Sequence, residues 1–172
     1  MAAGGAAATA AQHWRALLAA ALDSNAHLKH STYFQLATVS VNGRPANRTV
    51  VFRGFQEGSD NILINTDSRT RKIEEINQFH YGEQRKESWF ASSLKSRLQY
   101  LRPVPRLPVL EESSEDYQLD PSIGPLDSFC LLVFNPEQVD YVNLKRNVRF
   151  LFTSSRSSDQ SNNAWQIEKV NP

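Results

Sequence analysis

The sequence is poor in cysteine and has no long apolar run. Its single cysteine, Cys130, cannot form an intramolecular disulfide, and its place in the apolar run 129–133 predicts a small buried side chain. The longest apolar stretches, such as 16–22, are much shorter than the roughly 20 residues that cross a bilayer. We therefore expect a soluble protein with no membrane partner, in a reducing compartment.

Net charge is also nearly absent, because 19 Lys and Arg residues face 18 Asp and Glu residues. This balance creates no overall field that would draw the chain onto nucleic acid, so any anion site must be local. The segment 1–11 is almost all Ala and Gly, and it lacks both the charged start of a signal peptide and the Arg and Ser content of a transit peptide. A cytoplasmic location is expected on these grounds.

Common catalytic and nucleotide-binding motifs are missing as well. There is no Gly-x-Gly-x-x-Gly, no Walker pattern and no Gly-x-Ser-x-Gly, which argues against Rossmann, P-loop and α/β-hydrolase sites. The histidines have no metal-ligand spacing with one another or with the cysteine, so no metal site is predicted. They are His13, His27, His30 and His80.

Hydrophobic periodicity predicts a helix followed by a hairpin. Residues 10–28 carry apolar side chains at i, i+3, i+4, i+7 and i+8, which is typical of one face of a helix. Two β-rich runs, 33–41 and 44–55, are joined by Asn42-Gly43. This pair is a strong hairpin signal, for a turn in which both central residues adopt positive φ.

The middle of the chain is expected to contain a third strand and two helices. A strand at 61–65 leads into a helix capped by Asp67 or Ser68, and a longer helix is expected at 84–100. The predicted apolar faces are Ile73, Ile76 and Phe79 in the first helix, and Trp89, Phe90, Leu94 and Leu98 in the second.

The C-terminal third returns to β-structure. This order of elements predicts one mainly β domain with helices, of the α+β class, built on an antiparallel barrel. The expected strands are 129–134, 139–144, 148–152 and 164–170. The single domain is expected to span 1–172, with 1–10 disordered and 103–125 forming an exposed loop.

The segment 65–72 is the most informative one for function. It reads Asn-Thr-Asp-Ser-Arg-Thr-Arg-Lys, so hydroxyl and amide side chains are interleaved with three cations where a strand passes into a helix. Unpaired N–H groups at a helix start, the Arg fork and the Lys point charge all suit a phosphate. The same composition fits a solvated helix cap with basic surface residues, and the residues alone leave both interpretations open.

Arg48 and Arg53 lie at the two ends of an apolar strand core. Such ends meet either solvent or an anion. Successive side chains of a strand alternate, so positions 48 and 53 face opposite sides. One ligand could contact both only at the end of the strand or at a bulge.

Together, the segments 48–53, 65–66 and 71–72 resemble the FMN-binding pattern of the pyridoxamine 5'-phosphate oxidase-like split-barrel proteins. From Trp14 to Ile167 the chain is similar to the plant and cyanobacterial branch of that family. The resemblance implies an FMN-binding split β-barrel, flavin-dependent oxidoreductase activity and a homodimer that holds the flavin between two subunits. The residues that it assigns to the cofactor are Arg48, Thr49, Val50, Val51, Arg53, Asn65, Thr66, Arg71, Lys72, Ser93, Tyr141 and Arg149.

The resemblance also gives these residues roles. Arg48, Thr66, Arg71 and Lys72 are expected to contact the FMN phosphate, with Asn65 beside them. The main chain of Val50 and Val51 is expected to lie along the flavin ring, together with Tyr141 and Arg149. Arg53 is expected near the substrate, and Ser93 near the phosphate of the second flavin of a dimer.

The sequence departs from this family in two places. After Glu83 the family continues with two further strands, whereas here Glu83 runs directly into 84–89, which resembles a later helix. A block of some tens of residues is therefore missing, and the barrel is expected to be incomplete. In addition, 143–147 lacks the Arg-x-His signature of true pyridoxamine 5'-phosphate oxidases, so that activity is not expected.

Two functions follow from this comparison of motifs. The first is an FMN-dependent oxidoreductase whose substrate the sequence does not identify. The alternative is a non-catalytic or vestigial flavin- or phosphate-binding protein, a shortened form with weakened FMN binding.

Overall fold

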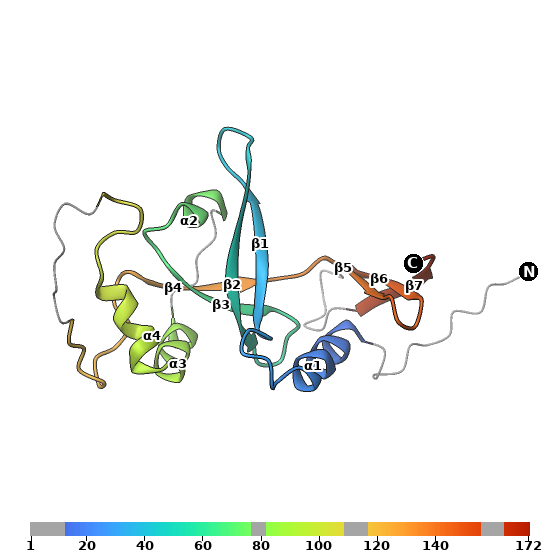
Figure 1. The fold of residues 1–172 in the computed structure, drawn as a ribbon, viewed down its shortest axis with the longest axis horizontal. Coiled ribbons are helices and arrows are strands. Elements are labelled where there is room, and N and C mark those ends of the chain that lie inside the picture. Colours follow the sequence, from blue (N-terminus) through green and yellow to red (C-terminus); the bar gives the residue numbers. More distant parts are fainter. Residues whose placement is uncertain (1–12, 77–81, 109–116, 156–163) are drawn as a thin grey trace, which may run out of the picture. The chain divides into compact units, whose positions relative to one another are not determined.

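The computed structural model describes residues 13–76, 82–108, 117–155 and 164–172 (Figure 1). Two compact units make up the chain, and each is considered by itself. Unit 1 consists of Met1–Thr32, Phe55–Ile62 and Asn135–Pro172. Unit 2 consists of Tyr33–Gly54 and Leu63–Phe134.

A four-stranded sheet forms the framework of unit 2. Its strands are ordered β1-β2-β3-β4, and β1 and β2 form an antiparallel hairpin in which Tyr33 is opposite Val51. Burial alternates along β1 and most of β2, as expected for strands with one covered face. The bounds are Tyr33–Val39 for β1, Pro45–Phe55 for β2, Ile62–Asp67 for β3 and Phe129–Phe134 for β4. The strand predictions for this part of the chain are therefore confirmed.

The hairpin turn differs from the predicted one. Gly43 has φ 75°, but Asn42 is not among the described residues with positive φ. The amide of Gly43 donates to the carbonyl of Ser40 at 2.8 Å, and the side-chain oxygen of Asn42 accepts from Ser40 Oγ at 2.5 Å. The loop thus has three residues, and only its last one needs the left-handed conformation. The sequence signal located the turn but gave the wrong type.

Replacing Gly43 by Ala is expected to lower the free energy of unfolding by about 1 kcal/mol, because a Cβ is strained at positive φ. Space is not the cause, since nothing lies within 4 Å of the added atom. Gly124→Ala is the matched control, because its added Cβ also meets nothing and its φ lies outside the strained range. Urea titration of both variants checks this expectation, and equal midpoints would contradict it.

The helices of unit 2 are shorter than predicted. The expected helix 84–100 is broken after Ala91, where Ser92 is extended and Ser93 begins a new helix by accepting the amide of Ser96. Phe90 and Leu94 lie beside this break and are exposed, which corrects the prediction that they face the core. The helices are α2 (Arg71–Ile76), α3 (Glu83–Ala91), α4 (Leu94–Leu98) and the 3₁₀ helix η2 (Gln99–Leu101).

The core of unit 2 lies between these helices and β4. Trp89, Tyr100 and Phe129 pack ring against ring with centroids 5.0 to 5.9 Å apart, and Leu119 joins them. The indole of Trp89 donates to the carbonyl of Ile123 at 2.8 Å, so its one polar atom is satisfied. Cys130 is buried on β4, as predicted, and burial raises the pKa of its thiol.

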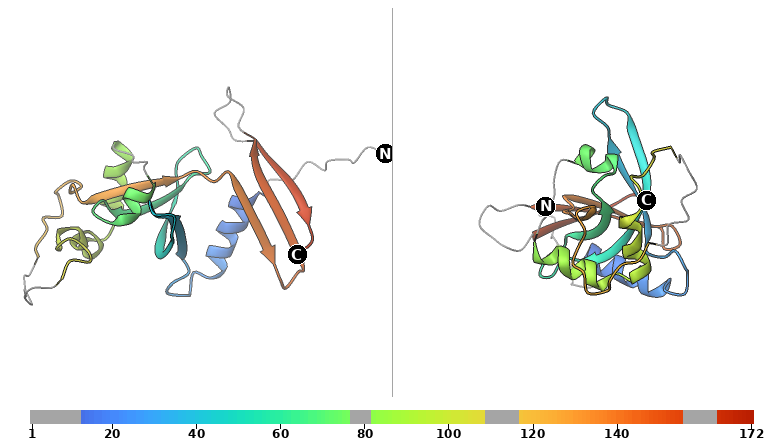
Figure 2. Two further views of the ribbon diagram at one scale, coloured as in Figure 1. Left: turned by 90° about the horizontal axis from the view of Figure 1, so that it is seen from above. Right: turned by 90° about the vertical axis from the view of Figure 1, so that its left-hand side faces the viewer.

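Unit 1 combines helix α1 with a three-stranded antiparallel sheet in the order β5-β6-β7 (Figure 2). Trp14 is only 3% exposed and lies against Phe55 and Trp165, with ring centroids 5.7 and 5.6 Å away. The indole of Trp165 donates to Asp60 at 2.7 Å. The bounds are Trp14–Ser24 for α1, Gln138–Asn143 for β5, Val148–Ser155 for β6 and Ala164–Val170 for β7.

The α+β class, with mostly antiparallel sheets and few helices, is confirmed. The expected disorder of 1–10 falls outside the described residues, and the single domain spanning 1–172 stays a prediction. Within the predicted loop 103–125, the described residues are mostly exposed, but Leu119 is buried. Across the described ranges, no helix has the length and apolar character that crossing a membrane requires.

Candidate functional site

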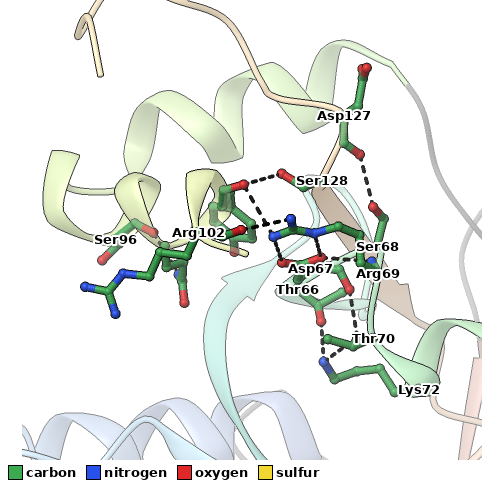
Figure 3. A network of polar contacts seen from close by, with 12 residues as sticks. Thr66, Asp67, Ser68, Arg69, Thr70, Lys72, Ser96, Arg102, Asp127 and Ser128 are labelled. Atoms are coloured by element: carbon green, nitrogen blue, oxygen red, sulfur yellow. Dashed lines mark hydrogen bonds and ion pairs between the residues drawn. The ribbon is translucent and has the colours of Figure 1, made fainter. Parts of the chain in front are cut away.

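A lysine and two threonines come together where β3 ends and α2 begins. Lys72 Nζ donates to Thr66 Oγ1 at 2.6 Å and to Thr70 Oγ1 at 3.0 Å (Figure 3). Thr66 is only 5% exposed, because it follows Ile64 on the covered face of β3. The short link between strand and helix folds the lysine back onto the strand, and its ammonium lies over a buried hydroxyl.

Arg48 is the second cation of this region. It lies on β2, on the same covered face as Val50, and its side chain is 21% exposed. Its guanidinium donates to Thr38 Oγ1, to the carbonyl of Leu36 at 3.4 Å and to Glu75 Oε2 at 2.7 Å. Contacts from β1 and α2 therefore fix this side chain.

The two cations are close enough to influence each other. The pKa of Lys72 is lowered, chiefly because the half-buried ammonium has lost hydration and secondly because Arg48 repels it. Asp67 and Glu75 act in the opposite direction but more weakly. Among the residues that the structure describes, no carboxylate lies within ion-pair distance of Lys72. An anion bound here would relieve an unfavourable charge arrangement.

Arg69 has a structural role. Its guanidinium forms two hydrogen bonds with the Asp67 carboxylate, at 2.9 and 2.7 Å, which raise the pKa of Arg69, and it donates to the carbonyl of Arg102 at 2.9 Å (Figure 3). The carboxylate of Asp67 also accepts the amide of Arg69 itself. Of the three cations in 65–72, Arg69 is therefore the one whose charge is already paired with a carboxylate of the protein. Asp67 or Ser68 was expected to cap the helix, but Asp67 organises the turn before α2 and Ser68 Oγ donates to the carbonyl of Asp127 at 3.1 Å.

Arg71 and Asn65 differ in their availability to a ligand. Arg71 is exposed, and within the described ranges it has no hydrogen-bond or ion-pair partner. The amide of Asn65 is engaged with α3, since its Oδ1 accepts from Ser88 Oγ at 2.6 Å and its Nδ2 donates to Ser92 Oγ at 3.1 Å. Arg71 thus keeps all its donors, and Asn65 ties β3 to α3.

The remaining candidates on β2 alternate as the strand geometry requires. Arg53 and Thr49 are exposed, on the face opposite Arg48, and Thr49 Oγ1 accepts from Gln35 at 3.0 Å. Val50 is 7% exposed, and Val51 lies opposite Tyr33 in the hairpin. The structure thus brings Arg48, Thr66 and Lys72 together but does not place Arg53 beside them.

Three candidates lie elsewhere. Ser93 caps α4 and is exposed. Tyr141 on β5 stacks on Phe150 with centroids 6.4 Å apart, and Arg149 on β6 forms a two-point ion pair with Asp140. Tyr141 and Arg149 belong to unit 1, so their part in a site with Arg48 stays a prediction.

The family model of the pyridoxamine 5'-phosphate oxidase, FMN-binding domain, matches residues 11–100. The chain belongs to this family. The matched range contains β1, β2, β3 and α2, and with them every residue of the cluster just described. FMN is therefore the cofactor that the cluster has to fit.

Relatives of this family agree with the sequence resemblance. The chain is 46% identical to pyridoxine/pyridoxamine 5'-phosphate oxidase 2 of Arabidopsis thaliana, over 92% of this chain and 96% of that protein. The crystal structure of a pyridoxamine 5'-phosphate oxidase-related, FMN-binding protein of Nostoc punctiforme matches with a TM-score of 0.82 and 34% identity, over 92% of this chain and 97% of that one. The fold is thus the FMN-binding split barrel, and the two relatives are plant and cyanobacterial, as predicted.

A more distant structure shows the fold alone. PhzG of Burkholderia lata 383, solved in complex with tetrahydrophenazine-1-carboxylic acid, matches with a TM-score of 0.59 and 14% identity, over 91% of each chain.

The residues of the cluster suit the phosphate of FMN. A half-buried ammonium, a guanidinium with free donors and the buried hydroxyl of Thr66 are groups of the kind that bind phosphate oxygens elsewhere. The sequence did not indicate three members of the cluster, Thr38, Thr70 and Glu75. Thr70 lies inside the basic segment 65–72, but Thr38 and Glu75 carry no local signal, because only the tertiary fold brings them to Arg48.

Proposed function

We propose that this family member binds FMN with its phosphate held by Arg48, Thr66, Arg71 and Lys72. The observation that carries the proposal is the half-buried Lys72 ammonium, which donates to the buried hydroxyl of Thr66 at 2.6 Å. The pKa of Lys72 is lowered, chiefly by lost hydration and secondly by repulsion from the nearby Arg48. A phosphate placed between such donors replaces the neutral hydroxyl acceptors of Lys72 by charged oxygens, so that both partners of each hydrogen bond are ionised. The exposed Arg71 adds a third positive charge next to them.

We further propose an FMN-dependent oxidoreductase, in which the bound flavin supplies the redox chemistry. The protein then contributes the phosphate grip, and Arg53 adds a positive charge on the other face of β2. Oxidation of pyridoxamine 5'-phosphate is not part of the proposal. The stretch 143–147, which lacks the Arg-x-His signature, forms the exposed turn between β5 and β6, where Asn143 accepts the amide of Arg146.

A homodimer and a cytoplasmic location belong to the same proposal. The dimer is supported by the family resemblance, in which the flavin lies between two subunits and Ser93, Tyr141 and Arg149 contribute to it. Gel filtration with mass measurement tests the dimer directly.

A specific observation also favours the second function, a shortened form with weakened FMN binding. The aligned region with the Arabidopsis relative spans 192 positions, 20 more than this chain has residues. The relative therefore contains residues that have no counterpart here, which supports the missing block predicted after Glu83. In this alternative the phosphate grip remains and the contacts to the flavin ring are reduced.

Titration with FMN and with riboflavin tests the proposal. Riboflavin has the same ring without the phosphate, so the ratio of the two dissociation constants isolates the phosphate grip. We expect FMN to bind at least about tenfold more tightly, since charge-assisted hydrogen bonds contribute roughly 1.5 to 3 kcal/mol each. Flavin fluorescence measures both constants. Equal affinities would leave segment 65–72 as a solvated helix cap.

A further inference from the structure

A buried carboxylate lies next to the proposed phosphate site. The side chain of Glu75 on α2 is only 4% exposed, although it carries a charge. Its Oε2 accepts from Thr38 Oγ1 at 2.5 Å and from Arg48 Nη2 at 2.7 Å. A carboxylate repels phosphate, so its place beside an anion site requires an explanation.

The contacts of Glu75 form a closed triangle. Thr38 contacts both Glu75 and Arg48, and these two contact each other. The corners come from β1, β2 and α2, which lie side by side in unit 2 (Figure 1). A guanidinium held at its rim by both β1 and α2 cannot change rotamer freely.

The triangle does not exhaust the donors of Arg48. A guanidinium has five N–H groups, and within the described residues three of them meet Leu36, Thr38 and Glu75. Two N–H groups therefore remain for a phosphate while Glu75 stays in place. The carboxylate also offsets the repulsion between Arg48 and Lys72, and with Arg71 the region keeps a net positive charge.

We propose that Glu75 is a positioning residue, which holds the Arg48 guanidinium in the orientation that receives the FMN phosphate. This inference rests on the proposed function of the same site. Ordering a long side chain upon binding costs affinity, and an arginine that is fixed beforehand avoids that cost. The carboxylate therefore acts through Arg48 and need not touch the cofactor.

Two substitutions separate this role from a simple charge effect. Glu75→Gln and Glu75→Ala both remove the negative charge, but only glutamine keeps an oxygen that can accept from Arg48 and Thr38. We expect the riboflavin-to-FMN ratio of dissociation constants to stay within about threefold of the parent in Glu75→Gln and to fall about tenfold in Glu75→Ala. Riboflavin affinity should be unchanged in both. The matched control is Glu74→Ala, which removes an exposed charge from the same helix and should leave the ratio as it is.

Each result decides the question. If both Glu75 variants bind FMN more tightly than the parent, Glu75 is a competing anion and the positioning role is wrong. The positioning role is also wrong if Glu75→Ala binds FMN with the same ratio as the parent. A parent that shows no preference for FMN over riboflavin would overturn the phosphate grip itself, and the positioning role with it. If Glu75→Ala does not fold, Thr38→Val replaces it, because it removes the third corner of the triangle and should lower the ratio in the same direction.

Discussion

Replacing Lys72 by methionine is expected to weaken FMN binding about tenfold to a hundredfold while the free energy of unfolding stays within about 1 kcal/mol of the parent. The loss of affinity follows from removing a charge-assisted contact to the phosphate. Stability is spared because the ammonium is held in a half-buried place near Arg48, where its pKa is lowered. Removing that unfavourable charge offsets the two hydrogen bonds to Thr66 and Thr70 that are lost.

The control is Lys95→Met, which removes the same charge from an exposed position on α4. It should change neither FMN affinity nor the ratio to riboflavin. Flavin fluorescence and urea titration give both quantities for each variant. If Lys72→Met bound FMN as the parent does, the lysine would be a structural residue that covers Thr66.

The pH dependence has a definite sign. A lysine whose pKa is lowered by folding destabilises the native state fully below its folded pKa, and the penalty disappears above the unfolded value of 10.5. The stability of the parent relative to Lys72→Met should therefore rise with pH in the window that begins at the lowered pKa and ends at 10.5. In the same window FMN affinity of the parent should fall, because the ammonium that binds phosphate is lost. Urea midpoints and FMN titrations between pH 7 and 10.5, at roughly unit steps, follow both changes.

The strands were predictable because their signals are local. Runs of β-branched and aromatic side chains between turn residues, alternating or continuous, predicted the bounds of β1 to β7 to within a few residues. The turn at Asn42 and Gly43 was located by composition, but its type was not, because a primed turn and a three-residue loop share that pair. The break between α3 and α4 was missed for a related reason, since Ser92 and Ser93 can lie inside a helix or cap one.

The site was predictable only in part. Interleaved hydroxyls and cations indicated Thr66 and Lys72, but the burial of Thr66 could be recognised only from the folded structure. Composition alone could not separate Arg69, which is paired with Asp67, from the exposed Arg71, and only the family resemblance assigned Arg71 to the cofactor. Nothing local marked Glu75 as the partner of Arg48, because 27 positions separate them in the chain.

A second large change is expected from lengthening the chain. A chimera would carry, after Glu83, the segment of the Arabidopsis relative that lacks a counterpart here. We expect it to bind FMN at least about tenfold more tightly than the parent, because burial of the flavin ring adds apolar contact to an unchanged phosphate grip. In the parent, the sheet of unit 2 ends at β1 and β4 among the described strands, so edges are left for further strands to pair with.

The measurement is bound flavin per chain after gel filtration, with the mass of each form recorded in the same run. The parent should lose most of its flavin on the column, and the chimera should retain close to one FMN per chain. A third form, with a Gly and Ser segment of equal length after Glu83, controls for the insertion itself and should behave as the parent does. Equal, near-stoichiometric flavin in dimers of parent and chimera would show that the shorter chain is a complete FMN site. Its contacts to the ring would then have to come from residues already present, with Tyr141 and Arg149 the first to replace.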